Sequence, residues 1–196
     1  MDEPSSPTRT ANRLLAFAHT RPWHGWANRI TLLRALLVMM IAATLPFPEF
    51  MASQSISLAS LAFVALLLDG LDGWVARRTG MISAFGARFD MEVDAIFILV
   101  LCAVLMVLDK VGAWVLAIGA MRYVFIIAGW HWDWLRAELP DSRRRKAICV
   151  WQVTTLLICL LPIVGHAQAS LLSGMALLLL SASFAMDVRW LRGNAD

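Results

Sequence analysis

Long apolar stretches separated by short polar segments make up most of the chain. A helix that crosses the hydrocarbon core of a bilayer needs about 20 mostly apolar residues. Six stretches approach that length: Ile30–Leu45, Ile56–Val75, Glu92–Leu108, Val111–Trp130, Ala147–Val164 and Ala169–Ala185. Because lipid offers no hydrogen-bond partners, each stretch must satisfy its own backbone as a helix. The pattern therefore predicts an all-α integral membrane protein with six transmembrane helices.

Composition supports one membrane domain. Of the 196 residues, 60% are hydrophobic, and the mean hydropathy is +0.69. We expect a membrane domain over residues 30–190, an N-terminal segment over 1–29 and a C-terminal tail over 191–196. The N-terminal segment mixes Leu and Trp with Arg and has no apolar core of the kind found in signal peptides. It is either an amphipathic helix on the membrane surface or a loosely ordered tail, since Pro22 interrupts the pattern.

Basic residues predict the orientation. Arg and Lys gather before the first stretch, between the second and third, between the fourth and fifth, and after the sixth. The loops on the other side contain a single basic residue, Lys110. The positive-inside rule then places both termini in the cytoplasm. With a net charge of only +3 and its basic residues beside the membrane, the chain is expected to contact anionic lipid and not nucleic acid.

Four carboxylates stand out against this apolar background. Asp69 and Asp72 are three residues apart, and Asp90 and Asp94 are four apart, so each pair shares one face of a helix. Both pairs lie at the cytoplasmic ends of predicted spans. Brought together, the four groups would repel one another unless a cation lay between them. Oxygen ligands of this kind favour one or two hard divalent cations, Mg²⁺ or Mn²⁺.

Small residues and an arginine accompany the carboxylates. Room for a ligand to approach the helix backbone is left by Gly73, Ala76 and Gly86. Arg77 adds a guanidinium group that can donate two parallel hydrogen bonds. Metals and an arginine beside small residues suit a phosphate, above all a pyrophosphate. The residues alone therefore indicate a phosphate-binding site from which a soluble head group can reach water while an acyl chain stays in lipid.

At these residues the chain resembles a known family. Residues 69–94 match every fixed position of D-x-x-D-G-x-x-A-R-x(8)-G-x-x-x-D-x-x-x-D, the signature of the CDP-alcohol phosphotransferases, also called class I CDP-alcohol phosphatidyltransferases. A weaker likeness begins at Asn28 and ends at Arg34, where the chain is similar to the N-x-x-T-x-x-R that opens the first span in many members.

The resemblance implies a division of roles among these residues. Asp69, Asp72 and Asp90 would bind two divalent ions, and Asp94 would be a further ligand and the general base. The cytidine diphosphate site would be lined by Asn28, Thr31, Gly73, Ala76, Arg77, Ser83 and Gly86.

The implied reaction transfers a phosphatidyl group from CDP-diacylglycerol to an alcohol and releases CMP, with the active site on the cytoplasmic side of a bacterial inner membrane. The alternative within the family is a soluble CDP-alcohol donor and a lipid acceptor. A cation transporter or a non-catalytic scaffold fits less well. Transporters usually hold ionisable groups near the midplane of the membrane, and a scaffold would be expected to lose one of the four aspartates.

The acceptor is less clearly marked. After Asp90, phosphatidylglycerophosphate synthases usually read Pro and then Ala-Asp-Lys, whereas this chain reads Met91-Glu92-Val93-Asp94-Ala95. This difference weakens the assignment of the chain to those synthases. A basic loop over Arg143–Lys146 either binds an acceptor phosphate, through Arg144 and Lys146, or only sets the topology. Together with Arg122 of the fourth span, this loop mildly favours a phosphorylated polyol such as glycerol 3-phosphate or inositol phosphate.

Arg122 lies deep in the fourth span, where an unpartnered charge is costly. It is expected either to bind the acceptor or to pair with a carboxylate of the cluster. The same span carries the small residues Gly112, Ala117, Gly119 and Ala120. These allow close packing in the homodimer that the resemblance suggests, or within a single chain.

Overall fold

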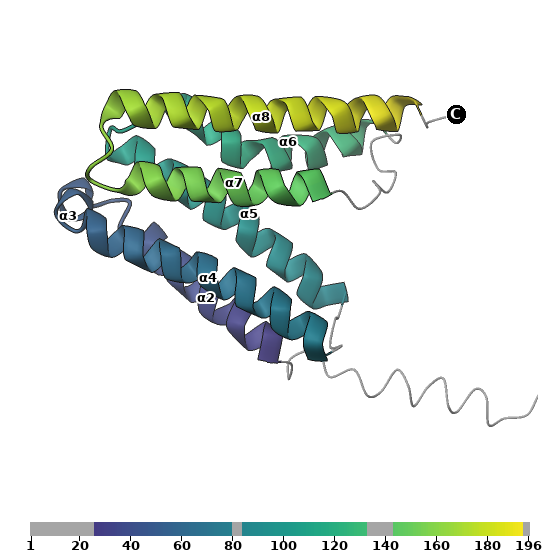
Figure 1. Cartoon of the computed structure of the whole chain (residues 1–196), viewed down its shortest axis with the longest axis horizontal. Helices are drawn as coiled ribbons and strands as arrows, with labels where there is room; N and C mark the ends of the chain where they lie inside the picture. Colours follow the sequence, from purple (N-terminus) through teal and green to yellow (C-terminus); the bar gives the residue numbers. More distant parts are fainter. Residues whose placement is uncertain (1–25, 80–83, 133–142, 194–196) are drawn as a thin grey trace, which may run out of the picture.

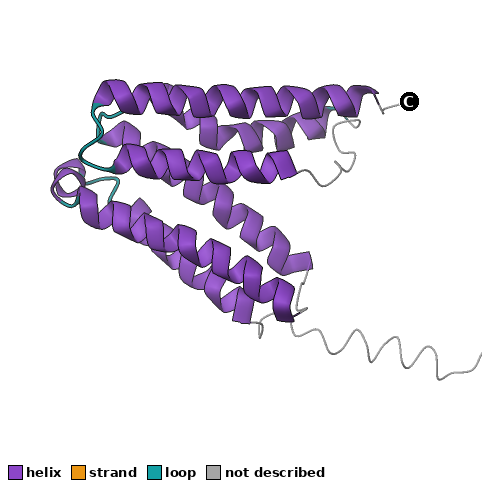
Figure 2. Cartoon of the chain, in the orientation of Figure 1, coloured by secondary structure: helices purple, strands orange, loops and turns teal. Residues whose placement is uncertain are grey.

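The structure is a computed structural model that describes residues 26–79, 84–132 and 143–193. These residues form helices joined by short turns, with no strand among them (Figure 2). The α-helices are α2 (Trp26–Ala43), α3 (Pro48–Ser53), α4 (Ser55–Thr79), α5 (Ala84–Val107), α6 (Leu116–His131), α7 (Arg143–Leu160) and α8 (His166–Gly193), and a 3-10 turn, η1 (Ala113–Val115), precedes α6. The all-α prediction is confirmed.

Helix α5 lies at the centre of the arrangement. It contacts α2 on one flank and α6 and α7 on the other. Figure 1 shows α2 beside α4 on the first flank and α6, α7 and α8 together on the second. Helix α5 therefore packs against helices of both flanks.

Within the described ranges, two helical segments are long and apolar enough to cross a membrane, Ala113–His131 and His166–Gly193. Ser55–Leu71 and Ala147–Leu160 are shorter apolar segments. Large apolar side chains face outward from several helices, including Met39 on α2. The six-span count stays a prediction. Of the predicted N-terminal segment, residues 1–25 lie outside the described residues, and the first described helix begins at Trp26, four residues before the predicted start of the first span at Ile30.

Hydrogen bonds from Lys110 stabilise the turn that follows α5. Asp109 adopts a left-handed conformation with φ of 54°, and the backbone N–H of Lys110 donates back to the carbonyl of Leu105 at 3.0 Å. The ammonium group of Lys110 donates to the carbonyls of Cys159, Leu161 and Val164 at 3.1, 2.5 and 3.2 Å. A cation at this position satisfies carbonyls that the end of α7 leaves without helical partners.

The core contains one unusually close helix contact. Apolar side chains from α2, α4, α5 and α7 form the buried centre, with Ile41, Leu105 and Leu156 fully buried. Where α6 crosses α5, a Cβ added to Gly119 would lie 2.7 Å from the Cα of Leu99. Only glycine fits this approach without a shift of one helix. This small residue of the fourth span therefore packs within the chain, and the homodimer stays a prediction.

Candidate active site

One face of α2 carries the residue on which the site is built. Thr31, Arg34, Val38 and Ile41 are all buried and recur every three or four positions, so they form a single stripe along the helix. Helix α2 packs against both α4 and α5. Arg34 has 0% relative exposure, and a buried charge of this kind is tolerated only when it is paired and hydrogen-bonded.

Three aspartates supply the partners of Arg34. Its Nη1 donates to Oδ1 of Asp69 on α4. Its Nη2 donates to Oδ1 of Asp90 at 2.7 Å, to Oδ1 of Asp94 at 2.8 Å and, more weakly, to the carbonyl of Asp90 at 3.3 Å. The carboxylates of α4 and α5 thus converge on one guanidinium. We call Asp69, Asp90 and Asp94 the acidic cluster.

The acidic cluster has the donor set of a divalent cation site. One carboxylate oxygen from each residue lies within 4.8 Å of the others. Each of the three side chains is 36% exposed, so the cluster is open to solvent while its arginine is buried. Hard oxygen ligands at this spacing fit Mg²⁺ or Mn²⁺, so the residues present agree with the predicted metals.

Most of the remaining predicted residues of the metal and nucleotide sites lie on helix ends near the acidic cluster. Gly86 lies in the first turn of α5 and Thr31 lies on the buried face of α2. Asp72, Gly73, Ala76 and Arg77 lie in the last part of α4, and Asn28 lies in the first turn of α2, but their side chains are outside the described part of the structure. Ser83 also lies outside the described residues.

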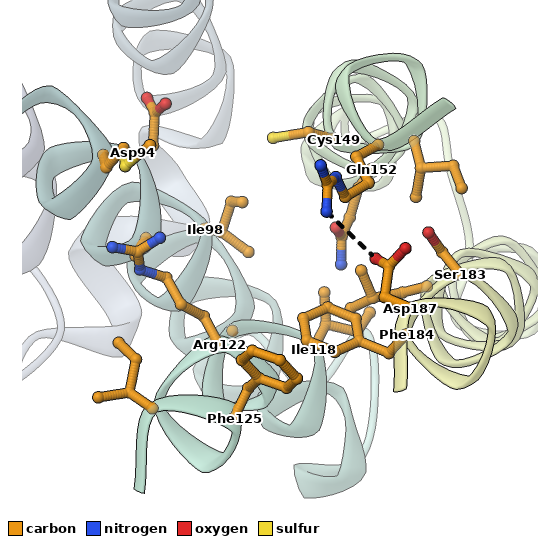
Figure 3. Close-up of a pocket in the computed structure, with 17 residues that line it drawn as sticks. Asp94, Ile98, Ile118, Arg122, Phe125, Cys149, Gln152, Ser183, Phe184 and Asp187 are labelled. Carbon is orange, nitrogen blue, oxygen red and sulfur yellow. Dashed lines mark ion pairs between the residues drawn. The ribbon is translucent and has the colours of Figure 1, made fainter. Parts of the chain in front are cut away.

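A cavity of about 640 Å³ adjoins the acidic cluster between α5, α6, α7 and α8 (Figure 3). Most of its wall is apolar. Its polar lining comes from Asp94, Arg122, Arg145, Gln152, Ser183 and Asp187. Asp94 therefore belongs both to the acidic cluster and to the wall of the cavity. The geometry places a carboxylate between a candidate cation site and a partly open cavity large enough for a small polar molecule.

Arg122 of α6 lines the cavity, and it forms an ion pair with a residue of α5 that is not part of the cavity lining. Its Nη2 lies 2.6 Å from Oε1 of Glu92 on α5. The sequence left two roles for Arg122, binding the acceptor or pairing with a carboxylate of the cluster. Among the described residues, its ion-pair partner is Glu92 and not a residue of the acidic cluster. Pairing with Glu92 still places the guanidinium in the cavity wall beside Asp94 (Figure 3).

The basic segment expected to be a loop is the first turn of α7, which begins at Arg143. Cations at a helix N-terminus oppose the helix dipole, and an acid from α8 compensates them. Asp187 accepts from Nη2 of Arg144 at 2.5 Å and lies 3.9 Å from Nη1 of Arg145. Arg145 lines the cavity, whereas Arg144 is absent from its lining. The side chain of Lys146 is outside the described part of the structure.

Five polar residues of the cluster and the cavity lining carried no predicted role: Arg34, Arg145, Gln152, Ser183 and Asp187. Arg34 could have been identified from the sequence, because it is the last residue of the N-x-x-T-x-x-R likeness. Gln152 is 3% exposed, and its Nε2 has no hydrogen-bond partner among the described residues. The same holds for Nε of Arg122. Two residues of the cavity wall therefore each have a shielded N–H donor without a partner among the described residues, and an unsatisfied buried donor costs about 1–3 kcal/mol.

Comparison with known proteins identifies the class. The family model of CDP-alcohol phosphatidyltransferases matches residues 25–186, which is most of the chain. The chain therefore belongs to the CDP-alcohol phosphatidyltransferase family. The match covers the acidic cluster, α5, α6 and α7, and ends within α8 at residue 186, one residue before Asp187.

A curated relative shares a short stretch. The CDP-diacylglycerol–serine O-phosphatidyltransferase of Methanocaldococcus jannaschii is 46% identical over 37 residues, which are 19% of this chain and 18% of that protein. The similarity thus spans less than a fifth of either protein. No solved structure matches the chain significantly.

Proposed function

We propose that this chain is a multi-pass membrane enzyme that transfers the phosphatidyl group of CDP-diacylglycerol to an alcohol acceptor and releases CMP. The observation that carries the proposal is the position of Asp94. Its Oδ1 accepts a hydrogen bond from Arg34 in the acidic cluster, and the same residue lines the cavity. A base placed there can reach an acceptor hydroxyl in the cavity and a phosphate held at the cluster.

In the proposed reaction, Asp94 takes the proton of the acceptor hydroxyl. The acceptor oxygen attacks the phosphorus that bears the lipid, the bond from this phosphorus to the bridging oxygen breaks, and CMP leaves with the bonding electrons. Proton removal by a positioned carboxylate contributes typically about 10²–10⁴ in rate. The acceptor and the donor therefore need to meet within hydrogen-bond reach of Asp94.

The donor side of the site is assigned to the cluster end of α2, α4 and α5. Two divalent cations, Mg²⁺ or Mn²⁺, would be held by Asp69, Asp72, Asp90 and Asp94, and when bound they neutralise the charge of the diphosphate. We assign the cytidine diphosphate contacts to Asn28, Thr31, Gly73, Ala76, Arg77, Ser83 and Gly86.

The acceptor is assigned to the cavity. Arg122, Arg145 and Gln152 line it and offer N–H donors, and two of these donors lack a partner among the described residues. This chemistry favours an acceptor rich in oxygen atoms, such as glycerol 3-phosphate or inositol phosphate, over choline. Two carboxylates, Glu92 and Asp187, already pair with arginines of the site, so only part of the positive charge remains for the ligand.

The membrane setting follows from the same features. We propose six spans, with both termini and the active site in the cytoplasm. Outward-facing apolar side chains on α2, α4, α6 and α8 support this placement, since soluble proteins rarely expose contiguous apolar surfaces of this kind. An acyl chain can then stay in lipid while the head group of the donor reaches the cluster.

The test is CMP release by the purified full-length protein with CDP-diacylglycerol and Mg²⁺ or Mn²⁺. The acceptor panel contains glycerol 3-phosphate, inositol phosphate, inositol, serine and choline; serine is included because of the curated relative. Asp94→Asn is expected to lower the rate about 10²–10⁴-fold. Asp109→Asn is the matched control, because it changes an aspartate at the far end of α5 and asparagine tolerates its left-handed backbone.

Release with one acceptor that is lost only in Asp94→Asn would support the proposal and name the product lipid. No release across the panel, followed by activity with a soluble CDP-alcohol and diacylglycerol, would replace the proposed donor. Equal activity of Asp94→Asn and Asp109→Asn would contradict the role given to Asp94.

A further inference from the structure

Arg34 has no part in the proposed chemistry, yet it is the most completely buried charge of the site. It extends from α2 into the space between α4 and α5 and donates to one oxygen, Oδ1, of each residue of the acidic cluster. One oxygen from each of these carboxylates also lies within 4.8 Å of the others, as a cation site requires. The guanidinium and a divalent cation therefore need the same three carboxylates.

We propose that Arg34 is the resident counter-cation of the acidic cluster. It holds the three carboxylates together in the metal-free protein and gives up part of its contacts when divalent cations bind. The inference rests on the metal site of the proposed function. Arg34 is accordingly a positioning residue, since it acts through Asp69, Asp90 and Asp94 and not on the reacting atoms.

Electrostatics explains why the metal-free cluster needs such a group. Carboxylates this close repel one another strongly, more so beside a low-dielectric core. A guanidinium offers several N–H donors in a fixed plane, so one group can serve oxygens from two helices at once, which an ammonium group does less well. The arrangement of α2, α4 and α5 around the cluster should therefore depend on Arg34 most when metal is absent.

The same argument predicts competition. A divalent cation held by the carboxylates that contact Arg34 would lie close to the guanidinium, and the two positive charges would repel. Removing the charge of Arg34 should then tighten metal binding, by about tenfold after allowance for solvent screening and for the poorer organisation of the carboxylates. A purely structural arginine would have the opposite effect or none, because loosening the cluster weakens its affinity for metal.

The experiment compares Arg34→Gln and Arg34→Lys with the wild type in detergent. Thermal unfolding is followed with EDTA and with saturating Mn²⁺, and Mn²⁺ binding is followed by the electron paramagnetic resonance signal of the free ion. Arg144→Gln is the matched control, because Arg144 also forms an ion pair, with Asp187, but outside the cluster. It should lower the Tm equally with and without Mn²⁺.

For Arg34→Gln, the loss of Tm is expected to be roughly twofold larger in EDTA than in Mn²⁺, and the Kd for Mn²⁺ is expected to fall about tenfold. Arg34→Lys, which keeps the charge, should lie between this variant and the wild type. Recovery of folded Arg34→Gln only when Mn²⁺ is present during purification would also support the proposal. If Arg34→Gln cannot be recovered in either condition, Arg34→Lys is judged by the same two measurements.

Equal losses of Tm in both conditions, or an unchanged or weaker affinity for Mn²⁺, would overturn the inference and leave Arg34 a structural residue. These outcomes do not affect the proposed function, which CMP release by the wild type tests separately. A wild-type protein that binds no Mn²⁺ would contradict both the metal site and the role of Arg34.

Discussion

Replacing Gly119 with alanine tests the closest helix contact beside the site. The added Cβ would lie 2.7 Å from Cα of Leu99, 2.9 Å from its Cδ1 and 3.0 Å from its Cβ. Because the nearest of these atoms is backbone, no rotamer change relieves the contact, and α6 has to move away from α5. Overpacking of this kind costs typically about 1–3 kcal/mol.

Gly174→Ala provides a control with the same chemical change. At Gly174, on α8, an added Cβ would find its nearest neighbour, Cη2 of Trp114, at 3.9 Å, which is ordinary contact. Both substitutions gain about 1 kcal/mol of helix propensity. The difference in stability between the two variants therefore isolates the steric cost of the added methyl group at Gly119. About 1–3 kcal/mol corresponds to a Tm difference of about 2–12 °C for a chain of this size.

The assay is thermal unfolding of both variants in one detergent, together with the KM for the acceptor. Gly119 and Arg122 lie about one turn apart on α6, so a shift of this helix also moves Arg122 relative to Asp94. We expect the acceptor KM of Gly119→Ala to rise several-fold, with little change in the KM for CDP-diacylglycerol. Equal Tm values for the two variants and an unchanged KM would refute the α5–α6 contact and the cavity wall built on it.

Three further predictions address other parts of the molecule. Gln152→Leu should raise the acceptor KM about tenfold, because one hydrogen bond to the acceptor is lost. Stability should not fall, since Nε2 of Gln152 has no partner among the described residues, and a lower Tm with a normal KM would contradict this prediction. Lys110→Met should lower the Tm by removing a charged cap on α7, at about 1–2 kcal/mol, while CMP release per folded molecule stays unchanged. EDTA should abolish CMP release and added Mg²⁺ or Mn²⁺ should restore it; activity that survives chelation would exclude the proposed role of metals.

The acidic cluster was predictable because its information is local. Residues four apart on one helix share a face whatever the helix packs against, so Asp90 and Asp94 could be paired from sequence alone. To place Asp69 beside them, it was enough that the helix carrying Asp69 meets the helix carrying Asp90. The match to the family signature predicted that contact. The structure brings one oxygen of each of the three within 4.8 Å of the others. Helix boundaries were less predictable, since the basic segment after residue 142 continues into α7.

The partners of the arginines could not be predicted, because they depend on how helices cross. Arg34 precedes its three partners by 35 to 60 residues, and nothing in the spacing of the N-x-x-T-x-x-R likeness shows which face of α2 meets α4 and α5. Arg122 finds Glu92 because α6 crosses α5 closely at Gly119. Asp187 lies two residues beyond the sixth apolar stretch, close to Arg189, so the sequence did not mark it as the partner of Arg144.

Helix α5 links the two halves of the proposed reaction. Asp90 and Asp94 contact Arg34 of α2 in the acidic cluster. On the same helix, Asp94 and Ile98 line the cavity that α6, α7 and α8 complete. A rotation of α5 would therefore move the base relative to the metal ligands and the acceptor at once. Because Arg34 holds α5 on one flank and the Gly119 contact holds it on the other, substitutions at either position should impair catalysis beyond their effect on stability.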